Sequence, residues 1–349
     1  MTTDMEAKPN PVAAVADHGG SLERARALFP QAPEPWVDLS TGINPHSYPL
    51  FDLPATAFAR LPEPARLDEL AGQAAAAYGA PSSHCVVPAP GTQSLLAHIA
   101  RLVAPGRARI LGPTYAEHAR VAALAGHRVE EVGDIAALEG ADLGILVNPN
   151  NPDGRMTARE PIVDMAARMQ GRGGLLVVDE AFMDVTSDTH SVAGDIGQGG
   201  LVVLRSFGKF FGLAGIRLGF ALTAEPLAEK LKDELGPWAV SGPALEYGLK
   251  ALGDSDWQRA NRQRLEVDAA RLDRLLAAAG LPQSTGTALF RFLRFAGAPA
   301  LFDHLGRHGI MTRAFSAMPN ALRIGLPGSE SEWKRLAAAL ESYRGEPHE

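Results

Sequence analysis

Residues 203–220 read VLRSFGKFFGLAGIRLGF and place one lysine, Lys209, among phenylalanines and glycines. A cation in such surroundings is costly, because burial without a partner favours the neutral amine. Lys209 is therefore paired, neutral or used covalently. The apolar runs on both sides of it are typical of two neighbouring strands.

The rest of the chain alternates short apolar runs with helical patterns. Strand-like runs occupy 108–113, 143–148, 174–180, 201–206 and 217–223. Helical patterns lie at 94–103, 115–125, 159–170 and 225–235. Continuous apolar strands separated by helices predict a parallel or mixed sheet covered on both faces. The predicted fold class is α/β.

The pattern changes after Pro237. A long helical stretch with a break near 253–257 is followed by strand-like runs and two further helices, which predicts a smaller α+β domain. The first 50 residues are rich in proline and glycine and predict an arm with little structure of its own. We therefore expect an arm at 1–50, a large domain at 51–240 and a small domain at 241–349.

Composition narrows the class of protein. Of 349 residues, 46% are hydrophobic and 21% charged, which is enough apolar material for a packed core. A net charge of -7 argues against nucleic-acid binding. The single cysteine, Cys85, excludes an internal disulfide and a cysteine metal cluster, and we expect no metal site. No signal peptide or membrane span is evident, so we expect a cytoplasmic protein with no membrane partner.

Polar residues follow several of the predicted strands. Gly91 in PAPGTQS lies at a strand-to-helix junction, where free N–H groups bind anions, although an ordinary N-cap has the same pattern. NPNNPDGR at 148–155 alone is an ordinary turn. Asp179 ends an apolar strand, where α/β folds bind ligands, yet such carboxylates are also common helix caps. Lys209 could instead form a structural ion pair with Asp179.

Taken in order, these motifs resemble the fold-type I pyridoxal-phosphate enzymes of the class I and II aminotransferase superfamily. A glycine turn, an aromatic in GPTYAEH, an asparagine turn, a strand-end aspartate and a lysine occur in that family's sequence. The resemblance covers about residues 36–343. It implies pyridoxal 5′-phosphate as cofactor, a large domain with a mixed, mostly parallel sheet between helices, a smaller α+β domain and an N-terminal arm packed on that domain and the active site.

The resemblance also implies roles for individual residues. Lys209 would hold the cofactor as a Schiff base, which explains a lysine in an apolar pocket. Asp179 would pair with the pyridine nitrogen, Tyr115 would stack on the ring, and Asn151 would donate to the ring 3′-oxygen. These three residues and Lys209 would contact the cofactor, with Lys209, Asp179 and Tyr115 as catalytic residues. The cofactor's phosphate would be held by Gly91, Thr92, Gln93, Ser206 and Arg217.

Two arginines are implied to bind substrate. Arg323 in ALRIGL matches the family's substrate-carboxylate arginine, where a planar fork suits a planar carboxylate. Arg313 in GIMTRAF matches an arginine of relatives with phosphorylated substrates, although a solvent-facing arginine at a strand end is the alternative. Asn151 would also contact the substrate.

Three further motifs, two of them near the N-terminus, point to one group within the superfamily. DHGG at 17–20, LSTGINPHSYP at 39–49 and DEAF at 179–182 look like the threonine-phosphate decarboxylases of cobalamin biosynthesis, which are similar to histidinol-phosphate aminotransferases. In that family the arm folds over the active site. Its implied substrate-binding residues here are His18, Gly19, Gly20, Ser40, Thr41, Gly42 and Asn44.

Two positions depart from the superfamily's commonest pattern. Phe182 replaces a tyrosine that bonds the ring 3′-oxygen, so one hydrogen bond to the cofactor is lost. Leu61 occupies the place of a tyrosine that reaches the partner subunit's phosphate. A homodimer with active sites at its interface is the family's expectation, and Leu61 removes one contact within it.

The implied reaction is the decarboxylation of L-threonine O-3-phosphate to (R)-1-aminopropan-2-yl phosphate and CO2. Lys209 is the expected proton donor to Cα, with water or Tyr115 as alternatives. A second possibility is an aminotransferase acting on histidinol phosphate or a related phosphorylated amine. A third is a non-catalytic scaffold of the corrinoid pathway, against which the retained lysine at 209 argues.

Overall fold

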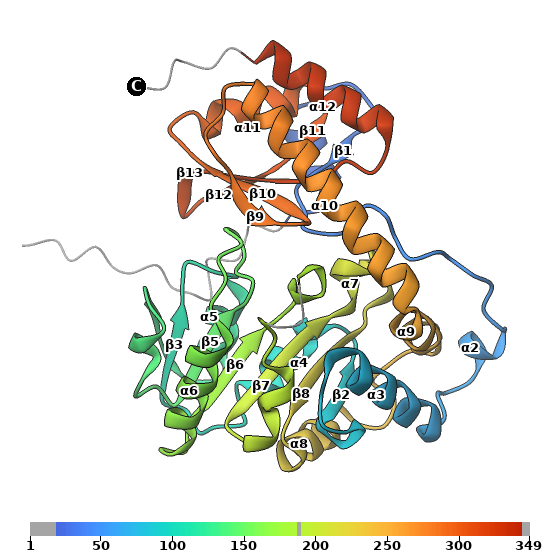
Figure 1. Cartoon of the computed structure of the whole chain (residues 1–349), viewed down its shortest axis with the longest axis vertical. Helices are drawn as coiled ribbons and strands as arrows, with labels where there is room; N and C mark the ends of the chain where they lie inside the picture. Colours follow the sequence, from blue (N-terminus) through green and yellow to red (C-terminus); the bar gives the residue numbers. More distant parts are fainter. Residues whose placement is uncertain (1–18, 187–189, 344–349) are drawn as a thin grey trace, which may run out of the picture.

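The computed structural model describes residues 19–186 and 190–343. A seven-stranded sheet forms its lower part in Figure 1. Its strands are β2 (Val86–Ala89), β3 (Arg107–Leu111), β4 (Arg128–Val132), β5 (Leu143–Val147), β6 (Leu175–Asp179), β7 (Leu201–Ser206) and β8 (Gly219–Thr223). The spatial order is β2-β8-β7-β6-β5-β3-β4, and only the pairs β2–β8 and β7–β8 are antiparallel. The expected mixed, mostly parallel sheet is confirmed.

Helices cover both faces of this sheet because its central strands are apolar on both sides. Val177 and Val202 pack in one core cluster, whereas the adjacent Val178 and Val203 pack in another. The first cluster contains residues of α4 (Thr92–Ile99), α5 (Glu117–Leu124) and α8 (Glu225–Leu235). The second contains residues of α3 (Pro64–Tyr78), α6 (Arg159–Gln170) and α9 (Gly242–Gly253). This double covering is the layer arrangement that continuous apolar strands predict.

A second, antiparallel sheet lies above the first in Figure 1. Its order is β12-β13-β10-β9, with bounds Arg313–Phe315, Met318–Gly325, Phe290–Arg294 and Thr285–Thr287. Its helices are α10 (Ser255–Ala278), α11 (Ala298–Arg307) and α12 (Glu330–Ser342). Helix α10 runs from the large sheet to the small one (Figure 1).

The N-terminal segment joins both parts. Strand β1 (Val37–Asp38) pairs in parallel with β11 (Ile310–Met311) beside the small sheet. Further short helices are α1 (Leu22–Leu28), α2 (Thr56–Ala59) and α7 (Phe207–Phe210). Short 3-10 helices lie at Ser83–Cys85, Ala136–Leu138, Met183–Val185, Ala193–Gln198 and Ala214–Ile216.

Local sequence fixes several helix ends. Asp254 caps α10 by accepting a hydrogen bond from the Trp257 amide at 3.0 Å, which separates α10 from α9 at the expected break. Ser329 and Glu332 form a capping box at the start of α12. Helices α10 and α12 thus begin where the sequence supplies side-chain acceptors for free amides.

The topology brings strand ends together at one edge. Strands β3, β5, β6 and β7 are parallel, and β2 runs in their direction because both it and β7 are antiparallel to β8. Their carboxyl ends therefore share the edge that faces the small sheet, where α7 lies (Figure 1). Ligands of open α/β sheets bind at this edge.

Candidate active site

Lys209 lies on the single turn of α7, directly after β7. Burial lowers its pKa to about 8, with Arg323 and Arg217 acting in the same direction and Asp179 opposing them. Its Nζ lies 5.7 Å from the centroid of the Phe182 ring. No ion pair of Lys209 is found in the described part of the chain, so the predicted alternative of a Lys209–Asp179 pair is not formed. The lowered pKa increases the neutral fraction of the amine at neutral pH, and the neutral form is the nucleophile.

Asp179 ends β6 and is paired with a histidine. Its Oδ2 lies 2.9 Å from Nε2 of His118, and its Oδ1 accepts a hydrogen bond from the Ala181 amide at 3.0 Å. Both side chains are buried. The pair fixes the orientation of the carboxylate at the sheet edge. His118 was not predicted as a functional residue, although it lies three positions after Tyr115 in the segment that follows a predicted strand.

An anion cradle forms where β2 meets α4. Gly91 has φ +82, and a Cβ added there would lie 2.6 Å from Nη2 of Arg217. A Cβ on Gly219 would lie 2.6 Å from the amide nitrogen of Thr92. Two glycines thus let a guanidinium and the first amide of α4 approach the same space, which is the arrangement that binds a phosphate. Ser206 lies at the neighbouring carboxyl end of β7, and its side chain makes no capping bond to α7.

Gln93 contacts two side chains beside the cradle. Its Nε2 donates to Oε2 of Glu117 at 2.7 Å, and its Oε1 accepts from the Tyr115 hydroxyl at 3.2 Å. Burial, together with Glu117, raises the pKa of Tyr115 to about 12. Burial therefore keeps Tyr115 a neutral phenol, and Gln93 fixes the position of its hydroxyl.

Arg323 lies on β13 and faces the large sheet's edge. Its Nη1 donates to Oδ1 of Asn151 at 2.6 Å, and its Nη2 donates to the Ser40 carbonyl at 2.9 Å. Its Nε is buried and has no hydrogen-bond partner among the described residues. A buried guanidinium with an unpaired donor suits a carboxylate ligand. Asn151 and Arg323, predicted from separate motifs, are thus in direct contact.

Arg313 lies directly across from Arg323 in the antiparallel pair of β12 and β13. Like charges at opposed positions of a sheet are destabilising unless an anion lies between or beside them. Burial lowers the pKa of Arg323, and Arg313 lowers it further. Two arginines on one face therefore suit a substrate with two anionic groups.

The glycines of the arm contact Ser40, whereas Asn44 contacts the segment that follows Lys209. Gly19 lies against Ser40, since a Cβ on Gly19 would be 2.4 Å from the Ser40 carbonyl oxygen, and the Gly20 amide donates to the Ser40 Oγ at 2.7 Å. Thr41 is half-buried, and Asn44 is buried against the backbone that follows Lys209. His18 lies outside the described residues.

Ser40 is buried, and its polar atoms are used within the protein. Its Oγ donates to Oδ1 of Asp38 at 2.6 Å, and its carbonyl accepts from Arg323. Ser40 therefore supports Arg323 in this structure.

Of the two positions that depart from the family pattern, Phe182 is buried and Leu61 is exposed. The Phe182 ring packs edge-on against Phe290, with ring centroids 5.2 Å apart. A Cβ on Gly42 would lie 2.9 Å from the Phe182 ring, so these residues are closely packed. Leu61 is 61% exposed.

A buried ionic cluster lies behind the site. Arg205 precedes Ser206 and pairs with Asp184 at 2.9 Å and with Glu180 at 3.2 Å. Burial raises the pKa of Glu180, whereas Arg205 opposes this change. Because Glu180 follows Asp179, the cluster ties together the ends of β6 and β7.

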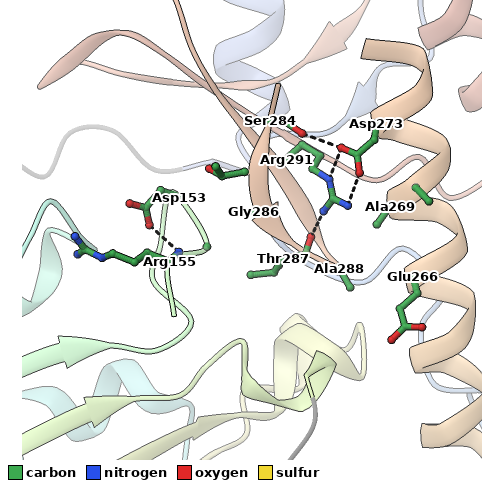
Figure 2. Close-up of a pocket in the computed structure, with 13 residues that line it drawn as sticks. Asp153, Arg155, Glu266, Ala269, Asp273, Ser284, Gly286, Thr287, Ala288 and Arg291 are labelled. Carbon is green, nitrogen blue, oxygen red and sulfur yellow. Dashed lines mark hydrogen bonds and ion pairs between the residues drawn. The ribbon is translucent and has the colours of Figure 1, made fainter. Parts of the chain in front are cut away.

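A cleft of about 660 Å³ opens beside the site (Figure 2). It lies between the turn that follows Asn151 and the elements α10, β9 and β10. Its charged side chains are largely engaged with protein partners: Arg291 pairs with Asp273, and Asp153 accepts from the Arg155 amide at 3.1 Å. Among the described residues, no group of three or more potential ligands is arranged for a metal ion.

Comparison with known proteins defines the class. The aminotransferase class I and II family matches residues 53–340, and the chain belongs to this family. The threonine-phosphate decarboxylase of Pseudomonas aeruginosa is 44% identical over 95% of this chain and 99% of its own. The threonine-phosphate decarboxylase of a Sinorhizobium species is 46% identical over 93% of this chain and 97% of its own length. A histidinol-phosphate aminotransferase of Vibrio cholerae is 30% identical over 60% of each chain.

Solved structures confirm the fold. Histidinol-phosphate aminotransferase from Sinorhizobium meliloti, in complex with pyridoxal-5′-phosphate, gives a TM-score of 0.78 at 22% identity, covering 93% of this chain and 94% of that one. L-threonine-O-3-phosphate decarboxylase from Porphyromonas gingivalis gives a TM-score of 0.73 at 21% identity. The match covers 88% of this chain and 98% of that one.

The cofactor of this chain is pyridoxal 5′-phosphate, as in its family. The residues fit it: Gly91 and Gly219 leave a cradle that a Cβ would fill, beside Arg217 and the amide of Thr92. A buried lysine of lowered pKa and a strand-end aspartate complete the set.

Among the described residues, none of the helices combines the length and apolar character needed to span a lipid bilayer.

Proposed function

We propose that this chain decarboxylates L-threonine O-3-phosphate to (R)-1-aminopropan-2-yl phosphate and CO2 in cobalamin biosynthesis. The observation that supports it most is the pair of threonine-phosphate decarboxylases, 44% and 46% identical over nearly the whole chain. The opposed Arg313 and Arg323 add a physical reason, because this substrate carries both a carboxylate and a phosphate.

Each residue has a role in this proposal. Bound pyridoxal phosphate supplies an electron sink for the pair left on Cα when the bond to the carboxylate breaks. Asp179, held by His118, would pair with the ring nitrogen and keep it protonated. Arg217, Ser206, Gly91 and Thr92 would hold the cofactor's phosphate. Tyr115, held by Gln93, would stack on the ring.

The substrate's orientation decides which bond breaks. Arg323 binds the carboxylate through its fork, and Arg313 binds the phosphate together with the arm residues at 18–20. Asn151 accepts a hydrogen bond from Arg323 and would donate to the cofactor's ring oxygen. Binding energy from the remote phosphate thereby holds the Cα–carboxylate bond perpendicular to the electron sink. After CO2 leaves, Lys209 in its ammonium form would deliver a proton to Cα and become the neutral amine.

The arm at 1–50 and the parts at 51–240 and 241–349 act as three units in this proposal. Contacts of Ser40 with Arg323, and of Asn44 with the backbone beyond Lys209, support an arm that reaches the site. Helix α9 packs on α3 of the large part, where Gly248 approaches Leu70 closely.

We further propose a cytoplasmic homodimer. The exposed Leu50, Phe58 and Leu61 lie close together in sequence, with fractional exposures of 77%, 70% and 61%. Exposed large apolar side chains suit an interface between copies of the chain. A monomeric mass by sedimentation of the cofactor-loaded protein at micromolar concentration would contradict it.

The test of the function is a parallel assay of the cofactor-loaded protein. One arm follows CO2 release from L-threonine O-3-phosphate, and the other follows glutamate formed from 2-oxoglutarate with histidinol phosphate as amino donor. CO2 without amino transfer supports the decarboxylase. Amino transfer without CO2 overturns it and favours the aminotransferase alternative.

A further inference from the structure

The turn that carries Lys209 is held at its end by a segment far away in sequence. Helix α7 is one turn long, so the carbonyls at its end and directly after it need partners from elsewhere. Four consecutive carbonyls, of residues 209–212, accept hydrogen bonds from residues 44–48, which we call the strap. The strap therefore determines where this turn ends.

Asn44 makes two of these four contacts. Its amide nitrogen donates to the Lys209 carbonyl at 3.0 Å, and its Nδ2 donates to the Phe210 carbonyl at 2.7 Å. Its Oδ1 accepts from the His46 amide at 2.8 Å. The side chain is 1% exposed, and both of its polar atoms are used within the protein.

Two other strap residues complete the set. The Tyr48 amide donates to the Phe211 carbonyl at 2.8 Å. The Ser47 hydroxyl donates to the Gly212 carbonyl at 2.9 Å. Gly212 has φ +65, and a Cβ there would lie 2.6 Å from the Asn44 carbonyl oxygen. Strap and turn are thus in backbone contact.

The strap is in turn fixed to α10. His46 Nε2 lies 2.7 Å from Oδ2 of Asp268, and the Tyr48 hydroxyl donates to Oδ2 of Asp254 at 3.0 Å. The Tyr48 ring also packs edge-on against Trp257 at 5.0 Å. The turn carrying Lys209 therefore cannot shift without breaking contacts at both ends of the strap.

We propose that Asn44 is a positioning residue for Lys209 and does not bind substrate. The amine of Lys209 must reach both the cofactor and, under the proposed function on which this step rests, the substrate Cα. Misplacement by about 1 Å is enough to cost about a hundredfold in rate. The expectation that Asn44 contacts substrate is replaced by this role.

The test compares Asn44→Ala and Asn44→Asp with wild type and with Asn261→Ala, which alters another buried asparagine that the site does not use. Asn44→Asp keeps the size and the acceptor for the His46 amide but loses the Nδ2 donor. The readouts are visible-region circular dichroism of the bound cofactor, kcat and KM for L-threonine O-3-phosphate, and the melting temperature.

We expect both Asn44 variants to lose cofactor dichroism and to lower kcat about tenfold to a hundredfold, with KM within about twofold. Asn261→Ala should retain the wild-type dichroism even where its melting temperature falls. A raised KM with unchanged kcat and dichroism overturns the proposal, as does a fall in melting temperature alone. If wild type releases no CO2, the proposed function fails, while the dichroism still decides the role of Asn44.

Discussion

Arg323 shows how one side chain connects the parts of the site. It contacts Asn151 of the large part and Ser40 of the arm, and its Nε is a buried donor without a partner among the described residues. Its contact with Asn151 could not be predicted from sequence, because the two residues are 172 positions apart and meet only when the sheets face each other.

Replacing Arg323 with alanine should raise KM for L-threonine O-3-phosphate about thirtyfold or more, since a buried charge-assisted contact contributes roughly 2 kcal/mol or more. Cofactor absorbance should remain. The control is Arg294→Ala, an exposed arginine of β10 in the same sheet. Steady-state kinetics beside an absorbance spectrum measure both effects, and unchanged KM would remove Arg323 from the substrate site.

Lys209 predicts a pH dependence for cofactor capture by the cofactor-free protein. Its pKa is lowered by burial, from the ordinary 10.5 to about 8, so the nucleophilic neutral amine is about a tenth of the population at pH 7. The capture rate should rise with pH and level off above about 8. Stopped-flow absorbance measures it. A rate still rising steeply beyond pH 10 would mean an unperturbed lysine.

At the scale of elements, the strongly apolar strands were predictable and the polar ones were not. Strands β5, β6 and β7 are buried on both faces, and their apolar runs mark them in the sequence. Strand β4 (Arg128–Val132) was not predicted, since its sequence RVEEV is polar and it lies at the sheet's edge. The α/β class was predictable from these apolar runs. Strand ends and glycines draw attention to the lysine, aspartate and arginine at 209, 179 and 217, and their roles come from the resemblance to the family.

The hydrogen-bond partners of the residues at these strand ends could not be predicted from the sequence. His118 and the strap residues act through contacts made by folding. His46, for example, meets Asp268 at a separation of 222 positions. A pair so far apart in the chain leaves no pattern in the sequence around either residue.

The junction of β2 and α4 makes a prediction about cofactor binding. Gly91→Ala should weaken pyridoxal phosphate binding about tenfold or more, because its Cβ would displace the Arg217 guanidinium. Gly79→Ala is the matched control, since Gly79 has φ +74 and nothing lies within 4 Å of its added Cβ. Cofactor titrations measure both. Equal affinity in the two variants would show that the cradle does not hold the phosphate.

At the scale of the whole molecule, the site is complete only where the two sheets meet. The turn bearing Asn151 contacts β9 at a close approach of Gly154 to Gly286. This contact lies at the edge of the cleft shown in Figure 2. It sets the distance between the large part and the small sheet.

Gly154→Ala should push this turn away from β9, because the added Cβ would lie 2.2 Å from the Gly286 carbonyl oxygen. We expect kcat/KM to fall about tenfold or more as Asn151 loses its place beside Arg323. Gly173→Ala is the control, with φ +77 and no atom within 4 Å of its Cβ. Equal kinetics in both variants would show that the contact between the sheets does not position Asn151.

The most direct test of the site is to trap the cofactor chemically on the lysine that binds it. Borohydride reduction of the cofactor-loaded protein, followed by proteolysis and mass spectrometry, identifies the modified lysine. The structure predicts the pyridoxyl group on Lys209 alone, and loss of labelling in Lys209→Ala. Labelling of another lysine, such as Lys232 or Lys250, with Lys209 unmodified would contradict the assignment of the site.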